Sequence, residues 1–139
     1  MIAGVVCSDV VIYDALTNKW SRGASMKEAR SWFGAAAVGD KVYVAGGQGA
    51  SKFLDSAEVY DMRTDTWTTI SSMAVVRSSC QGVALDGHFW VIAGEYQRSY
   101  QKSSAEVYDP VTDTWRFVPD MYLDNNKVYT PLVQNLQTA

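Results

Sequence analysis

A twelve-residue phrase that occurs twice constrains the fold of this chain more than any other feature of its sequence. Residues 104–115 read Ser-Ala-Glu-Val-Tyr-Asp-Pro-Val-Thr-Asp-Thr-Trp, and residues 56–67 match them at ten of the twelve positions. A weaker third copy, Tyr13-Asp14 followed by Trp20, keeps the six-residue spacing between aspartate and tryptophan. The chain is therefore a repeat protein, and its period decides how the other patterns are interpreted.

The period is close to 47 residues. The tryptophans that end the three copies are 47 and 48 residues apart, and the methionines that follow them repeat these intervals at Met26, Met73 and Met121. Such a period is typical of four-stranded propeller blades and also of some two-helix repeats. The β-branched and aromatic runs at 42–45 and 89–92, each followed closely by glycine, favour strands. We therefore expect an all-β fold.

Each repeat is expected to contain four strands, named A to D from the inside of the blade outward. Strand A is placed at 32–38 and 81–85, strand B at 41–46 and 88–93, strand C at 56–60 and 105–108, and strand D at 66–70 and 114–118. The small residues of strand A suit the crowded wall of a central channel. Gly39-Asp40 and Thr64-Asp65 are turn residues that separate strands.

The repeat divides the chain into four units. Residues 1–22 should supply the tail of a strand B and then strands C and D of a broken blade. Residues 23–70 and 71–118 should form two complete four-stranded antiparallel blades. Residues 119–139 are either the start of a further blade, with strand A near 128–133, or a frayed C-terminal tail. Because closed propellers typically have 4–8 blades, we expect a fragment of a larger ring or half of a dimer with roughly six blades.

Composition narrows the functional class. The net charge of −3 and the pI of about 5.0 argue against a general nucleic-acid or anionic-membrane surface. Cys7 and Cys80 match no metal spacing and are expected to be reduced thiols. The first residues do not resemble a signal peptide, and no apolar run approaches the roughly 20 residues of a membrane helix. A cytoplasmic or nuclear location, or both, is the expectation.

The sequence offers no set of residues for chemistry. His88 is the only histidine, and no nucleophile has an identifiable base beside it in the pattern. No cluster of histidine, cysteine and carboxylate residues has ligand spacing. We therefore expect no catalytic residue, no metal and no cofactor, and we interpret the chain as a non-enzymatic interaction segment.

The recurring residues resemble the kelch motif over roughly residues 9–121. Its elements are Arg30 before strand A, then Gly46-Gly47, then Tyr60-Asp61 and Trp67, with Ala93-Gly94 as a departure in the second blade. Positions that recur with the repeat are interpreted as structural: Tyr13, Asp14, Trp20, Gly46, Gly47, Tyr60, Asp61, Trp67, Gly94, Tyr108, Asp109 and Trp115. The resemblance implies a partial kelch β-propeller.

The phrases at 26–33, 78–82 and 89–94 are similar to those of plant-type F-box/kelch proteins. That resemblance implies a substrate-recognition segment of a cullin-type ubiquitin ligase, joined to the ligase subunits through an N-terminal F-box that this chain does not contain. A BTB-type kelch protein and a scaffold or actin-associated kelch protein remain open. A fragment of a kelch-like copper oxidase is the weakest alternative, because only one histidine is present.

Strand direction places the D–A and B–C loops on one face, and we expect partner recognition there. The candidate residues on this face are Arg30, Ser31, Gln48, Lys52, Arg77, Ser78, Tyr96, Arg98, Tyr100 and Lys102. Their basic character suits a protein or peptide partner that is acidic or phosphorylated. For Arg30 and Arg77, which recur with the repeat, the alternative is that they tie neighbouring blades together through backbone carbonyls. The loop at 95–103 does not repeat and is the strongest candidate for specificity.

Overall fold

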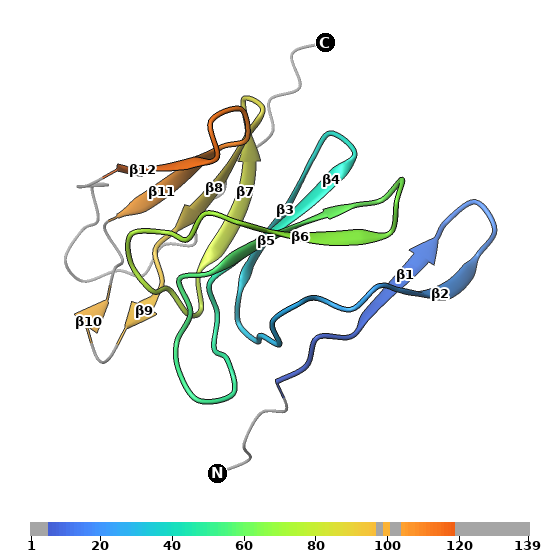
Figure 1. Cartoon of the computed structure of the whole chain (residues 1–139), viewed down its shortest axis with the longest axis horizontal. Coiled ribbons are helices and arrows are strands. Elements are labelled where there is room, and N and C mark those ends of the chain that lie inside the picture. The colour runs from blue at the N-terminus through green and yellow to red at the C-terminus, as the bar shows by residue number, and fades with distance from the viewer. Residues whose placement is uncertain (1–5, 97–98, 101–103, 119–139) are drawn as a thin grey trace.

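Two antiparallel four-stranded sheets form the body of the molecule (Figure 1). The computed structural model describes residues 6–96, 99–100 and 104–118. Blade 1 has the strand order β3 (Gly34–Val38), β4 (Lys41–Ala45), β5 (Ala57–Asp61) and β6 (Thr66–Ile70). Blade 2 has the order β7 (Gln81–Leu85), β8 (His88–Ile92), β11 (Ala105–Asp109) and β12 (Thr114–Val118). The prediction of an all-β partial propeller with two complete blades is confirmed.

Two further hairpins stand outside the blades. Strands β1 (Val10–Asp14) and β2 (Lys19–Gly23) pair only with each other, as expected for the outer strands C and D of a broken blade. Strands β9 (Glu95–Tyr96) and β10 (Ser99–Tyr100) form a short hairpin within the B–C loop of blade 2, where the sequence pattern predicts no strands. The strand A predicted near 128–133 and the strand B tail before residue 6 lie outside the described residues.

The two blades meet along their inner strands β3 and β7 and through a shared apolar core. Gly82 lies so close to β3 that a Cβ at this position would overlap the backbone of Ala35. Farther out, the Tyr43 ring packs against Phe89 and Tyr108 of blade 2, with both centroid distances at 5.6 Å. The small inner residues therefore allow two strands to approach, and aromatic side chains fill the widening space between the sheets.

A tryptophan and a tyrosine in each blade bind the outer hairpin to the segment that enters the blade. The indole Nε1 of Trp67 donates to Ala24 O at 2.8 Å, and that of Trp115 donates to Ser71 O at 2.6 Å. One turn aspartate completes each contact. Asp65 accepts from Tyr60 Oη at 2.6 Å and from the Ala24 amide at 2.8 Å. The repeated phrase therefore acts as a structural clamp.

The hydrogen bond between Tyr60 and Asp65 is expected to lose its contribution to stability at alkaline pH. The hydrogen bond to Asp65 raises the pKa of Tyr60 to about 12, whereas an unfolded tyrosine has a pKa near 10. Because the folded pKa is higher, the contribution is fully present below about pH 10 and is lost as pH rises towards 12. Tyr60→Phe should therefore lower the free energy of unfolding at pH 8, and the gap from the parent chain should shrink between pH 10 and 12. Urea unfolding across this range tests it, and a gap that does not change with pH contradicts it.

Candidate partner-binding face

The D–A and B–C loops lie on one face, and in both blades they are joined by backbone hydrogen bonds. In blade 1, the Ser31 amide donates to Gln48 O at 3.0 Å and the Gln48 amide donates to Ser31 O at 2.7 Å. In blade 2, Ser78 and Glu95 exchange the equivalent bonds at 3.2 and 2.7 Å. The strand directions inferred from the sequence therefore bring these loops together as expected, and each blade presents them as one paired unit.

Arg77 lies in the interior of this unit, with 0% of its surface exposed. Its Nε donates to Glu106 Oε2 at 3.0 Å, and that glutamate is also fully buried. Its Nη1 donates to Ala93 O at 2.8 Å, and its Nη2 donates to Ser104 Oγ at 2.9 Å. The guanidinium group therefore joins the D–A loop to the ends of strands B and C of the same blade.

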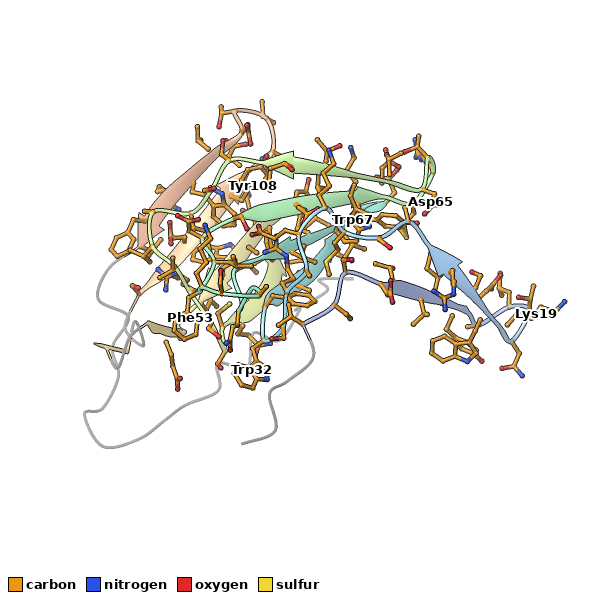
Figure 2. The ribbon with its side chains drawn as sticks, turned by 60° about the horizontal axis from the view of Figure 1, so that its bottom comes forward. Lys19, Trp32, Phe53, Asp65, Trp67 and Tyr108 are labelled. Carbon is orange, nitrogen blue, oxygen red and sulfur yellow. The ribbon has the colours of Figure 1, made fainter. Side chains whose placement is uncertain are left out.

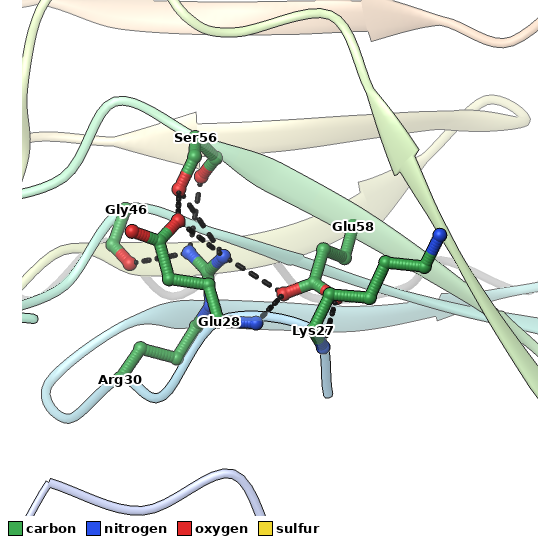
Figure 3. Close-up of polar contacts among 6 residues, drawn as sticks. All are labelled: Lys27, Glu28, Arg30, Gly46, Ser56 and Glu58. Atoms are coloured by element: carbon green, nitrogen blue, oxygen red, sulfur yellow. Dashed lines mark hydrogen bonds and ion pairs between the residues drawn. The ribbon is translucent and has the colours of Figure 1, made fainter. Parts of the chain in front are cut away.

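Arg30 makes the equivalent contacts in blade 1 and is 2% exposed (Figure 3). Its Nη2 donates to Glu58 Oε2 at 3.0 Å, and its Nη1 donates to Gly46 O at 2.8 Å and Ser56 O at 3.0 Å. The Glu58 carboxylate also accepts hydrogen bonds from the backbone amides of Lys27 and Glu28. Each arginine–glutamate pair thus holds a loop in place through charge-assisted hydrogen bonds.

These contacts favour the structural interpretation of Arg30 and Arg77 over partner binding. The side-chain bonds stay within one blade, whereas the alternative had placed them between neighbouring blades. On this face the blades are joined instead by backbone hydrogen bonds, such as the one that the Gly47 amide donates to Arg77 O at 2.6 Å. The paired glutamates also neutralise the two charges, so these arginines do not make the face basic.

The other candidate residues differ in accessibility. Ser78 is buried, Ser31 and Gln48 are half-buried, and Lys52 is exposed. Arg98 and Lys102 lie outside the described residues. Tyr96 and Tyr100 contribute backbone to the β9–β10 hairpin, but their side chains lie outside what the structure describes. Their role in partner binding stays a prediction.

Trp32 also lies on this face, and its position was not predicted from the sequence. It was placed at the start of strand A, but β3 begins at Gly34, and Trp32 instead has φ +53° with 64% of its surface exposed. Figure 2 places it on the same side as Phe53 of the B–C loop and away from Asp65 of the β5–β6 turn. Positive φ is rare for a bulky side chain, and such backbone strain clusters at binding sites.

Ser79 occupies the equivalent position in blade 2. It has φ +54°, and its amide donates to Trp32 O at 2.9 Å. The left-handed conformation is therefore a property of the repeat, and the tryptophan is particular to blade 1. The sequence contains one sign of this difference between the blades. Ser31 of blade 1 aligns with Ser78 of blade 2, but the next residue is the large aromatic Trp32 in blade 1 and the small polar Ser79 in blade 2.

The fold and the paired loops define a partial β-propeller built from arginine-anchored blades. The kelch motif family matches residues 29–74 and 77–122, and the chain belongs to this family. Kelch repeats imply a protein-interaction module. The fold is shared with the solved structure of YjhT, with a TM-score of 0.68 at 14% identity over 86% of this chain and 53% of that chain.

Similar curated proteins carry the name F-box/kelch-repeat protein. SKIP11 of Arabidopsis thaliana is 43% identical over 83 residues, which cover 59% of this chain and 18% of the relative. The F-box/kelch-repeat protein At2g44130 of the same species is 46% identical over 90 residues, which cover 62% of this chain and 22% of the relative. The chain therefore spans about a fifth of the length of these relatives. The resemblance to plant F-box/kelch proteins is confirmed.

The described residues also bear on metal binding and on membrane insertion. No group of three or more histidine, cysteine, aspartate or glutamate side chains is arranged there to hold a metal ion. Within the same part of the chain, no helix is long and apolar enough to cross a membrane.

Proposed function

We propose that this chain is the substrate-recognition part of an F-box ubiquitin ligase that acts in the cytoplasm or nucleus. Membership of the kelch family and similarity to proteins named F-box/kelch-repeat support this proposal. The face formed by the D–A and B–C loops would bind the substrate. An F-box outside these 139 residues would join the complex to the other ligase subunits.

Trp32 is the observation that carries the proposal. A tryptophan ring that is largely exposed leaves apolar surface in water, and a partner that covers it gains the hydrophobic contribution. Tryptophan is also among the residues most enriched in interface hot spots. The loops on either side are fixed by backbone pairing and by the buried Arg30–Glu58 pair, so the ring is presented from a rigid base.

The charges of the described face bear on the chemistry of the partner. Arg30 and Arg77 are paired with buried glutamates, so attraction to an acidic or phosphorylated peptide would depend on Lys52 together with Arg98 and Lys102. The exposed ring of Trp32 suits an apolar or aromatic side chain of the partner. We therefore propose that the partner is a peptide that packs such a side chain against Trp32. Its acidic groups would lie at the edge of this contact.

Proximity labelling with the gene product that contains this chain tests the proposal. Trp32→Ala should reduce the labelling of substrate proteins at least tenfold, because removing a hot-spot side chain costs about 2 kcal/mol or more. Labelling of the adaptor–cullin subunits should not change, since they would bind through the F-box. Arg63→Ala, at an exposed side chain in the β5–β6 turn, is the matched control and should change neither.

Two outcomes would contradict the proposal. Unchanged substrate labelling by Trp32→Ala would exclude Trp32 as the recognition residue. Labelling of actin without adaptor or cullin would remove the ligase role and favour a scaffold protein.

A further inference from the structure

The segments that enter the two complete blades share a register but differ in chemistry. Residues 27–29 of blade 1 read Lys-Glu-Ala, whereas residues 74–76 of blade 2 read Ala-Val-Val. In both blades the strand C glutamate accepts hydrogen bonds from backbone amides of this segment. Ala74 is exposed and Val75 is half-buried. Because blade 1 makes the same backbone contact with polar side chains, the blade fold does not require the apolar ones of blade 2.

A position on strand D beside this segment changes in the same way. Phe117 of β12 is the cross-strand partner of Glu106, and blade 1 has Thr69 at the equivalent position. Such partners lie on the same face of a sheet with their Cβ atoms about 4.5–5.5 Å apart, and Glu106 also accepts the Ala74 amide at 2.5 Å. Phe117 is 43% exposed. Ala74, Val75 and Phe117 are therefore grouped around Glu106, and we call them the outer patch.

The outer patch is joined to Trp32 by one short segment, residues 75–79. At its inner end, the Ser79 amide donates to Trp32 O at 2.9 Å. At its centre, the backbone of Arg77 bonds to the B–C loop of blade 1, and the next residue pairs with the B–C loop of blade 2. Backbone hydrogen bonds therefore hold the segment to both B–C loops, so the outer patch and Trp32 keep a fixed relation to each other.

The surface of this segment is uncharged. Arg77 is the only charged residue between positions 71 and 80, and it is fully buried in its ion pair with Glu106. The exposed Lys52 belongs to the B–C loop of blade 1, beside the segment. An apolar side chain of a partner can therefore cover the outer patch and gain the hydrophobic contribution without burying an unpaired charge.

We propose that an extended peptide of the substrate lies along residues 74–79, with one apolar side chain against Trp32 and a second against the outer patch. A fully extended segment of this length spans at most about 17 Å. The two apolar side chains of the peptide are therefore about four to six residues apart. This inference rests on the proposed function, because it states the form of the substrate that the same face binds.

A random peptide library displayed on phage, selected on the gene product that contains this chain, tests the inference. The selected peptides should carry two apolar side chains about four to six residues apart. Fluorescence polarisation of one labelled peptide then measures its affinity, which Trp32→Ala and Phe117→Thr should each lower about fivefold or more. Phe117→Thr introduces the residue that blade 1 has at this position, so it suits the blade fold. Thr69→Ala, at the equivalent position of blade 1, is the matched control and should leave the affinity unchanged.

A double-mutant cycle between protein and peptide separates direct contact from an indirect effect on the loops. Replacing one of the two apolar peptide residues by alanine should remove most of the effect of Phe117→Thr on affinity. Replacing the other should remove most of the effect of Trp32→Ala. Effects that simply add in both cycles would show that neither protein side chain contacts the peptide.

Failure of this inference can be told from failure of the proposed function. If Trp32→Ala weakens peptide binding and Phe117→Thr does not, the outer patch is excluded and the proposed function stands. If the library yields no binding peptide, an extended peptide is excluded in favour of a folded partner. Self-association of the parent protein that Phe117→Thr abolishes would assign the patch to a second copy instead. If both substitutions weaken peptide binding but no adaptor or cullin is labelled, the inference stands and the ligase role is lost.

Discussion

Arg77→Met is expected to lower the free energy of unfolding by about 3–5 kcal/mol, because it leaves the carboxylate of Glu106 buried without its cation. Both partners are fully buried, and their Nε–Oε2 distance is 3.0 Å. The substitution also removes the donors that satisfy the carbonyls of Ala93 and Ser104. Urea unfolding followed by circular dichroism measures the change.

A double-mutant cycle isolates the charge effect. Glu106→Gln removes the negative charge and keeps an acceptor for the Ala74 amide, which bonds the carboxylate at 2.5 Å. Arg77→Met combined with Glu106→Gln should therefore be more stable than the sum of the single changes predicts. Arg63→Met, in the exposed pair Arg63–Asp40, is the control and should cost about 1 kcal/mol or less. Additive single changes would contradict a charge-coupled pair.

This prediction also affects how partner binding is tested. Substitution of Arg30 or Arg77 should destabilise the loops that carry the binding face, so a loss of binding in such variants would not identify a contact residue. Trp32 avoids this difficulty because its side chain is largely exposed.

Gly46→Ala is expected to cost about 2–5 kcal/mol, the second large effect. Gly46 has φ +69°, which strains a residue with a side chain by roughly 1–2 kcal/mol. A Cβ at this position would also overlap the carbonyl oxygen of Arg77, which accepts the Gly47 amide and joins the two blades. Overpacking of this kind typically adds about 1–3 kcal/mol. Urea unfolding again measures the change.

Gly39→Ala is the matched control for the backbone term. Gly39 has φ +63°, but no atom lies within 4 Å of the added Cβ. It should therefore show the conformational cost alone, about 1–2 kcal/mol. Equal destabilisation by the two substitutions would show that the close approach of the blades adds nothing.

The repeat period made most of the fold predictable. Each described blade strand lies within two residues of its expected position, because the turn residues and the β-branched runs recur in register. The outer strands of the broken blade were predictable for the same reason. The β9–β10 hairpin was not, since the loop at 95–103 has no second copy against which to compare it.

The candidate site was predicted less completely. The sequence correctly placed the D–A and B–C loops on one side, because strand direction alone decides which loops share a side. Partner binding by that side stays a prediction. The sequence did not decide whether the side chains of Arg30 and Arg77 are exposed or buried, because an arginine in a loop can either extend into solvent or pair with a buried carboxylate. Glu58 and Glu106 belong to the repeated phrase, where a single acidic residue in a strand gives no sign that it receives an ion pair.

The sequence by itself determined the repeat, the strand order, the family and the face on which the loops gather, because these follow from local pattern and chain direction. Only the tertiary structure decided which residues of that face are accessible. Burial of Arg77 against Glu106 depends on two segments 29 residues apart, and the exposure of Trp32 depends on a left-handed backbone at the blade entrance. Neither is encoded in a spacing, because both arise only when separate strands pack against one another.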